Sequence, residues 1–186
     1  DDLKLVGAAG LTVAGNIDVD GTTNLDAVDV DGAVNFAADV TFADGADIIT
    51  ASAGTSNFRA GVNAGNSIAS GGNYNVAIGD EAGTAITTGD TNVAIGWSAL
   101  YTATTSSNNI AIGADAMYAN TTGASNVAIG KSSLDANTSG SNNTALGLAS
   151  LGANTTADNN TALGHTAMNV NTTGHSNVAV GQGALD

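Results

Sequence analysis

The sequence contains no cysteine and no proline, and it has few aromatic and few basic residues. Without cysteine there is no disulfide, no thiolate nucleophile and no cysteine-ligated metal centre. The absence of proline suits long uninterrupted strand ladders, because proline has no N–H group to donate to one. Three Lys and Arg residues stand against 17 Asp and Glu residues, a formal net charge of −14. This charge repels nucleic acid and anionic membrane surfaces, so we expect neither as a partner.

Long apolar runs are also missing. No run approaches the roughly 20 residues that span a bilayer, so we expect no membrane insertion, and there is no signal-peptide pattern. At 42 % hydrophobic and 11 % charged residues, the composition does not fit a disordered chain either. The sequence starts at Asp1 without a Met and stops at Asp186 in mid-pattern, so we expect it to be a piece of a longer polypeptide.

A strict repeat of 17 residues runs through the second part of the chain. Its signature is Asn, an aliphatic residue or Thr, Ala, an aliphatic residue and Gly, at residues 75–79, 92–96, 109–113, 126–130, 143–147, 160–164 and 177–181. A degenerate copy, 18 residues long, begins near Arg59. The period is too short for helix-pair repeats, and Asn, Thr and Gly are poor helix formers. The sequence therefore predicts an all-β fold, a parallel β-solenoid with one coil per repeat.

The signature segment supplies the structural repeat positions. In its first three strict copies these are Asn75, Ala77, Ile78, Gly79, Asn92, Ala94, Ile95, Gly96, Asn109, Ala111, Ile112 and Gly113. Strand alternation places Val76 and Ile78 on one face and Ala77 on the other. A narrow coil has only one interior, so one apolar face must contact something else. Because a column of Ala flanked by Gly allows close backbone approach, we expect the Ala column to be the contact between identical chains around an axis.

The second half of the repeat adds another apolar column and a turn. The apolar column consists of Leu100, Met117, Leu134, Leu151, Met168 and Leu185. It is followed by an N-T-T-G turn, whose Gly we expect to supply a positive φ angle. The signature asparagines, stacked from coil to coil, are expected to form an amide ladder.

The first fifty residues follow a different pattern. Apolar residues alternate with polar ones, glycines punctuate the runs, and ten of the 17 acidic residues lie here. We predict an Asp-rich β-strand shaft at 1–50, a joint at 51–57 and the solenoid at 58–186. The Asp-Val-Asp-Gly segments at 18–21 and 29–32 are interpreted as strand ends with Asp-Gly turns, not as calcium sites.

Few residues carry reactive chemistry. His165 and His175 occupy unrelated positions of the repeat, so we expect surface residues and no metal, cofactor or catalytic set. Trp97, Tyr101 and Tyr118 fall close together in the repeat register; they could contact a glycan, or they could only cover an edge. Six asparagines begin an N-x-[S/T] pattern, the acceptor pattern for N-glycosylation, and we interpret them as turn and ladder residues of the repeat. They are Asn120, Asn137, Asn142, Asn154, Asn159 and Asn171.

The NVAIG-x-x-A-L unit with N-T-T-G spacers resembles repeats of phage tail fibre proteins and related bacterial surface proteins. Its NVAIG core is similar to the head repeats of trimeric autotransporter adhesins, which are left-handed parallel β-rolls of three chains with a shorter repeat. The resemblance covers residues 57–186. It implies a homotrimeric structural fibre segment, in a virion or on a cell surface, that projects a host-recognition tip.

Two other functions remain open. In an adhesin head, the repeat surface itself would bind a host cell-surface glycan, another receptor or matrix protein. A polysaccharide-degrading enzyme would need paired carboxylates at a fixed separation. The acidic residues of the repeat region are scattered over several registers, so we expect no enzymatic activity. These residues are Asp80, Glu81, Asp90, Asp115, Asp135, Asp158 and Asp186.

Overall fold

The computed structural model describes residues 54–186. The chain divides into two compact units, 1–46 and 47–186, and the described residues belong to the second. The expected shaft at 1–50, its Asp-Gly turns and residues 51–53 of the expected joint lie outside the described residues.

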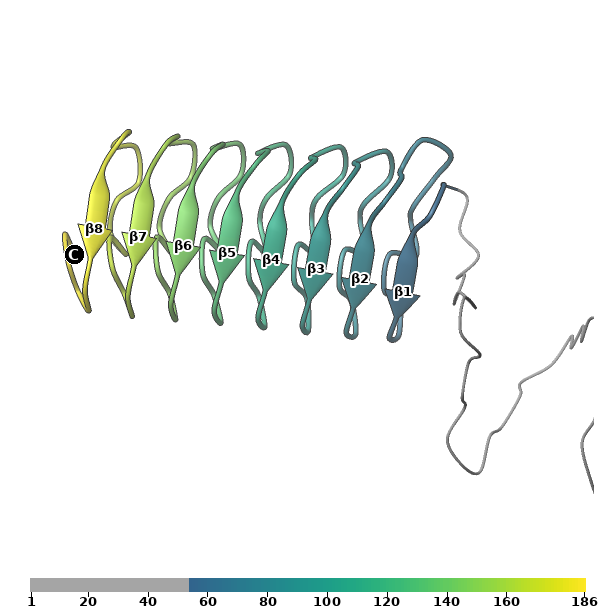
Figure 1. Ribbon diagram of the computed structural model, residues 1–186, viewed down its shortest axis with the longest axis horizontal. Helices are drawn as coiled ribbons and strands as arrows, with labels where there is room; N and C mark the ends of the chain where they lie inside the picture. Colours follow the sequence, from purple (N-terminus) through teal and green to yellow (C-terminus); the bar gives the residue numbers. More distant parts are fainter. Residues whose placement is uncertain (1–53) are drawn as a thin grey trace, which may run out of the picture. The chain divides into compact units, whose positions relative to one another are not determined.

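Residues 54–186 form a β-solenoid (Figure 1). Eight strands of three residues make one parallel sheet in sequence order, and the described residues contain no helix. Each strand pairs with the equivalent residues of the next coil, 17 residues on, or 18 between β1 and β2. The predicted fold class is confirmed. The strands are β1 (Phe58–Ala60), β2 (Val76–Ile78), β3 (Val93–Ile95), β4 (Ile110–Ile112), β5 (Val127–Ile129), β6 (Thr144–Leu146), β7 (Thr161–Leu163) and β8 (Val178–Val180).

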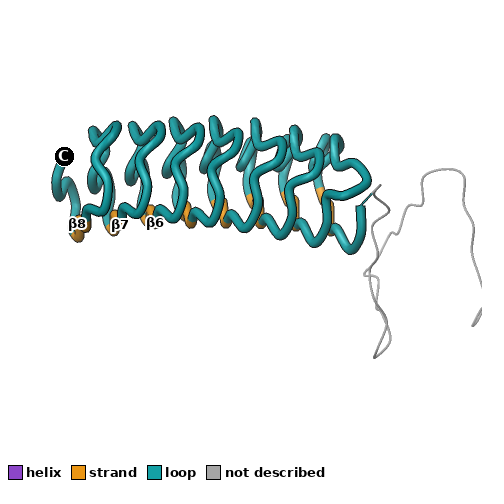
Figure 2. Tube along the Cα trace, turned by 90° about the horizontal axis from the view of Figure 1, so that it is seen from above, coloured by secondary structure: helices purple, strands orange, loops and turns teal. Residues whose placement is uncertain are grey.

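The strands are short because the residues that follow them leave the extended conformation. The signature glycine ends each strand at a φ angle that side chains rarely adopt, for example 129° at Gly113. Further positive φ angles follow in the same coil, such as 58° at Asp115 and 51° at Met117. These positions bend the chain back on itself. The strands therefore occupy one side of the stack, while turns and loops complete each coil (Figure 2).

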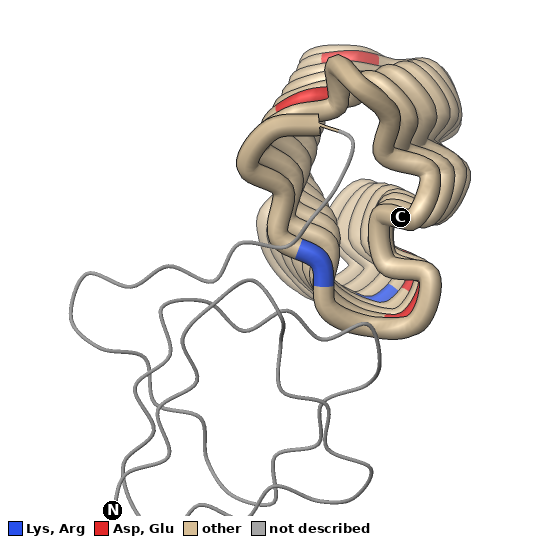
Figure 3. The backbone as a smooth tube through the Cα atoms, turned by 90° about the vertical axis from the view of Figure 1, so that its right-hand side faces the viewer, with Lys and Arg blue, Asp and Glu red and all other residues tan. Residues whose placement is uncertain are grey.

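Coils also pair outside the strands. The Leu100 N–H group donates a hydrogen bond to the Ala116 backbone carbonyl of the next coil at 2.9 Å. The Ser98 N–H group donates one to the Asp80 backbone carbonyl of the preceding coil at 3.0 Å. Figure 3 looks along the solenoid and shows that the coils superimpose. Backbone polar groups are thereby satisfied from coil to coil in the loops as well as in the sheet.

The Ala column fills the interior of the coil, which corrects our prediction. Ala77, Ala94 and Ala111 are completely buried, whereas Ile78 and its equivalents are partly or largely exposed. The reason is space: inside the coil the Ala column packs against the predicted Leu and Met column, so the longer Ile and Val side chains turn outward. The face of the strands opposite the Ala column, which carries aliphatic residues, is therefore the one that points away from the coil interior.

The predicted Leu and Met column is the inner column of the coil and is buried along most of its length. Leu100, Met117, Leu134 and Leu151 have no exposed surface, and Met168 has almost none. Leu185, in the last coil of the described residues, is 63 % exposed because none of these residues covers it.

The asparagine ladder is confirmed and begins earlier than predicted, at Asn57. At each step the side-chain oxygen of a buried Asn accepts a hydrogen bond from the ladder Asn of the next coil. For example, the backbone N–H and the Nδ2 group of Asn92 both donate to Asn75 Oδ1, at 2.9 and 3.0 Å. Asn92 Nδ2 also donates to the Ser106 carbonyl at 2.8 Å. A second ladder links Asn137 Nδ2 to Asn120 Oδ1 at 2.8 Å and Asn154 Nδ2 to Asn137 Oδ1 at 2.9 Å.

The glycine of the N-T-T-G turn has a different role from the predicted one. Gly123 and Gly140 are not among the residues with positive φ. They are needed because a Cβ atom at Gly123 would overlap the Gly140 carbonyl oxygen, and one at Gly140 would overlap the Ala157 carbonyl oxygen. The positive φ falls instead just before the ladder asparagine, for example 58° at Ser125.

Candidate functional site

The outward face of the sheet carries an uncovered row of aliphatic residues with two threonines among them, which we call the aliphatic stripe. Two residues from each strand from β2 to β8 form it, and all of them are at least partly exposed. They are Val76, Ile78, Val93, Ile95, Ile110, Ile112, Val127, Ile129, Thr144, Leu146, Thr161, Leu163, Val178 and Val180.

No charged residue interrupts this stripe. Strands β2–β8 contain only Val, Ile, Leu, Ala and Thr, and charged positions lie at a few other places on the coil outline (Figure 3). Parallel sheets are normally covered on both faces, yet Ile110 is 37 % and Leu146 45 % exposed. A contiguous apolar surface of this kind is typical of a protein–protein contact.

The structural repeat residues predicted from the sequence lie in four columns along the sheet. The Asn and Ala residues point into the coil, Ile78, Ile95 and Ile112 point out, and the Gly residues end the strands. The glycines allow close stacking: a Cβ atom at Gly79 would lie 2.8 Å from the carbonyl carbon of Gly96.

The three aromatic residues singled out in the sequence lie on one region of the solenoid. The rings of Tyr101 and Tyr118 stack with their centroids 5.0 Å apart and their planes 1° from parallel. Trp97 is 58 % exposed. Trp97 and Tyr118 line a cavity of about 320 Å³, whereas Tyr101 does not.

Three polar residues complete this cavity, which we call the aromatic–acidic pocket. Asp115, Ser132 and Asp135 line it together with the two aromatic residues. These three residues were not among the predicted contact residues. Their proximity could have been predicted from the repeat register. Asp135 lies 17 residues after Tyr118, and Asp115 and Ser132 occupy equivalent positions in adjacent coils.

The pocket is electrostatically unfavourable for one of its carboxylates. Burial raises the pKa of Asp135 above its ordinary value, and the nearby Asp115 carboxylate raises it further. Hydrogen bonds to the backbone N–H groups of Ala136 and of Asp135 itself act in the opposite direction. The dominant cause is the removal of the carboxylate from water.

Metal-ligand clusters are not found in the described part of the chain. No group of three or more His, Cys, Asp and Glu residues there could hold a metal ion. His165 is exposed, and His175 Nδ1 accepts a hydrogen bond from the Asp158 N–H group at 2.9 Å. The two histidines are therefore not brought together as a site.

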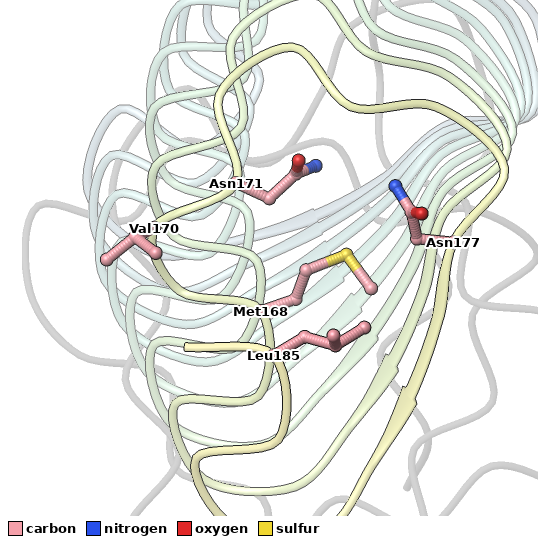
Figure 4. Close-up of a pocket in the computed structure, with 5 residues that line it drawn as sticks. All are labelled: Met168, Val170, Asn171, Asn177 and Leu185. Atoms are coloured by element: carbon pink, nitrogen blue, oxygen red, sulfur yellow. The ribbon is translucent and has the colours of Figure 1, made fainter.

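A second cavity, of about 330 Å³, opens at the last coil (Figure 4). Met168 and Leu185 belong to the inner apolar column, and Asn171 and Asn177 belong to the asparagine columns. In the preceding coils these columns are covered by the next coil. The cavity is therefore the stacking surface of a coil.

The asparagines of the N-x-[S/T] patterns differ in accessibility. Asn120, Asn137 and Asn154 are completely buried in the second ladder, so they are closed to modification in the folded chain. Asn142 and Asn159 are exposed, each one residue before a buried ladder asparagine.

Comparison of the chain with models of protein families, with curated proteins and with solved structures gives no significant match. Among the described residues, no helix has the length and hydropathy to cross a membrane.

Proposed function

We propose that the chain is a structural segment, shaft or head, of a phage tail fibre or similar surface appendage, without enzymatic activity. Three copies associate through their aliphatic stripes and project a host-recognition tip. The aliphatic stripe carries this proposal, because it is the one long apolar surface that the fold leaves uncovered on the sheet.

The internal bonding of the solenoid supports a mechanical role. Each coil is joined to the next by the sheet, by loop hydrogen bonds and by the buried ladder that includes Asn92 and Asn109. Repeat architectures of this kind gain stability from each neighbouring interface. A rod that is bonded along its whole length resists local opening and proteolysis.

The sequence motif supports the biological setting. The NVAIG-x-x-A-L units resemble repeats of tail fibres and trimeric adhesin heads, and in this chain the Val and Ile residues of that motif form the exposed face. Trimeric association would place three such faces around a common axis. This arrangement removes the stripes from water without any charged group to desolvate.

Cysteine cross-linking tests the proposed interface, because the chain has no cysteine of its own. Leu146→Cys places one thiol on the stripe at a residue that is 45 % exposed. With a short bis-maleimide reagent at low protein concentration, we expect covalently linked chains. The control is Thr122→Cys, at an exposed turn residue outside the sheet, which should remain unlinked. Equal linkage at both residues, or linkage at neither, would contradict the proposal.

One observation favours a second candidate, an adhesin head whose repeat surface binds glycan or matrix protein. The aromatic–acidic pocket joins exposed rings to hydrogen-bonding groups in a small cavity, as small-ligand sites do. A glycan array probed with this chain tests it: binding should be lost in Trp97→Ala and Tyr118→Ala. An array without bound glycans would remove glycan binding from this candidate and leave the structural role in place.

A further inference from the structure

The aromatic–acidic pocket combines two exposed aromatic rings with two carboxylates, and no cationic side chain of residues 54–186 lines it. We infer that this pocket binds an organic ammonium group, primary or methylated, carried on a small carbon skeleton. The inference rests on the second candidate function above and names its ligand chemistry. It is independent of the proposed trimer, because one chain supplies all five lining residues, Trp97, Asp115, Tyr118, Ser132 and Asp135.

Tyr118 is 40 % exposed and lines the pocket. Tyr101, one coil earlier, covers one face of the Tyr118 ring with a parallel ring at 5.0 Å, a distance close to the spacing between coils. The next residue along the same column is Asp135, which lines the pocket with Tyr118. A ligand in the pocket therefore meets an aromatic ring and a carboxylate together. Because the face of an aromatic ring carries negative charge density, this combination favours a cation.

The carboxylates themselves need a positive partner. Asp115 and Asp135 line the same cavity and repel each other, and Asp135 is partly removed from water. Among residues 54–186 the only Lys and Arg residues are Arg59 and Lys131, and neither lines the pocket. An ammonium group placed there would relieve the repulsion and replace the lost hydration of Asp135.

Other ligand classes fit the lining less well. An anion would be repelled by both carboxylates. A metal ion would need more ligands, because the described residues hold no group of three or more acidic or His side chains at one place. A neutral sugar can stack on Trp97, but it leaves the repulsion between Asp115 and Asp135 in place. With about 320 Å³, the cavity is at the small end of ligand sites, which suits a single small group.

The same ammonium chemistry has three sources: a free small molecule such as choline, an amino sugar within a glycan, and a lysine side chain of a protein. Choline, glucosamine and lysine amide acetylated at its α-amine therefore form the three arms of the test. Their uncharged counterparts are 3,3-dimethylbutanol, N-acetylglucosamine and norleucine amide acetylated at its amine.

Trp97 is the single tryptophan of the chain and lines the pocket, so its fluorescence reports binding directly. The full chain is titrated with each compound at constant ionic strength. We expect saturable fluorescence changes from at least one charged compound, with a dissociation constant on the order of 1 mM, and at least tenfold weaker binding of its uncharged counterpart. Equal binding of a charged compound and its counterpart, or saturation by none, would overturn the inference.

Variants connect the signal with the pocket. Asp115→Asn and Asp135→Asn keep the shape of each side chain but remove one charge, so each should weaken binding about threefold to tenfold. Tyr118→Leu should weaken it by a similar factor. The matched controls are Asp186→Asn and Tyr74→Leu, both at exposed residues outside the pocket, which should bind like the unchanged chain.

The outcomes separate the inference from the function on which it rests. Circular dichroism identifies any variant that does not fold, and the two Asp variants provide independent tests. Unchanged affinity in the folded Asp variants would overturn the ammonium inference. Glycan binding that depends on Trp97 but is indifferent to charge would likewise overturn it, while leaving the adhesive function standing.

Discussion

Asn109 illustrates how single residues hold neighbouring coils together. Its Oδ1 accepts from the N–H group of Asn126 at 3.0 Å, and its own N–H group donates to Asn92 Oδ1 at 3.0 Å. Its Nδ2 donates to the Gly123 carbonyl at 3.0 Å. One completely buried amide thus satisfies groups on both sides, which explains why the repeat uses Asn at this position.

We predict that Asn109→Ala lowers the free energy of unfolding by about 2 kcal/mol. The substitution leaves the buried Asn126 N–H group without its acceptor, whereas the Gly123 carbonyl keeps a donor in Asn120. Urea unfolding measures the change. Thr105→Ala, at an exposed residue of the same coil, is the control and should stay within about 0.5 kcal/mol of the unchanged chain. An equal loss in both variants would contradict the ladder's role.

Two signature glycines allow the cost of a positive φ angle to be measured separately from the cost of steric overlap. Gly113 and Gly181 have similar φ angles, 129° and 122°. A Cβ atom at Gly113 would lie 2.7 Å from the carbonyl carbon of Gly130, but one at Gly181 would have no neighbour within 4 Å. We predict a cost of about 1 kcal/mol for Gly181→Ala and about 3 kcal/mol for Gly113→Ala, measured by urea unfolding. If both cost the same, the glycine is required for φ alone.

Asp135 gives a pH-dependent prediction. Because burial raises the pKa of this carboxyl in the folded chain, ionisation favours the unfolded state, and that penalty disappears as the pH falls through the folded pKa to below the ordinary value of 3.8. Asp135→Asn should therefore raise the unfolding midpoint at neutral pH, and its advantage should vanish in acid. Thermal unfolding across this range measures it, with Asp186→Asn as the exposed control. An advantage that is independent of pH would refute the explanation.

At the scale of the element, the coil is the unit of folding. The register places every strand opposite its equivalent in the next repeat, so one whole coil can be removed without disturbing side-chain columns. We predict that deletion of residues 126–142 leaves the far-ultraviolet circular dichroism per residue unchanged and lowers the melting temperature slightly.

A partial deletion is the control for this experiment. Removing only residues 126–133 shifts the ladder and core columns out of register, so the β signal should be lost or the melting temperature should fall sharply. A chain that tolerates the partial deletion as well as the whole-coil deletion would show that the register does not determine the fold.

The sequence predicted the coil well because its signals are periodic. The 17-residue spacing, the stacked asparagines and the column containing Leu100 and Met117 determine which residues stack on one another. Periodicity does not say which strand face is inside. Alternation separated Ala77 from Ile78, but only the narrow space beside the inner column decides that Ala faces inward.

The pocket was only partly predictable. The register placed Trp97 and Tyr118 near one another, but Asp115 and Asp135 appeared scattered because they occupy different positions in successive repeats. Whether the two carboxylates come close together depends on how the loop between these positions turns. The turn uses positive φ angles at Asp115 and Met117, and neither residue type predicts a positive φ angle.

At the scale of the whole molecule, the solenoid has a closed interior and one uncovered apolar face. The ladder, the inner column and the Ala column are all satisfied within a single chain. The aliphatic stripe is different, because residues such as Ile110 and Leu146 have no partner surface in the described part of the chain. Self-association through the stripe is therefore the central claim of the proposed function.

Sedimentation equilibrium of the unmodified chain tests this claim most directly, since it gives the mass in solution without reference to shape. The mass of one chain is 17.9 kDa. We predict a single species of three times this mass that persists at high salt, because the contact is apolar. A species with the mass of one chain throughout the concentration range would contradict the trimer and the function proposed for it.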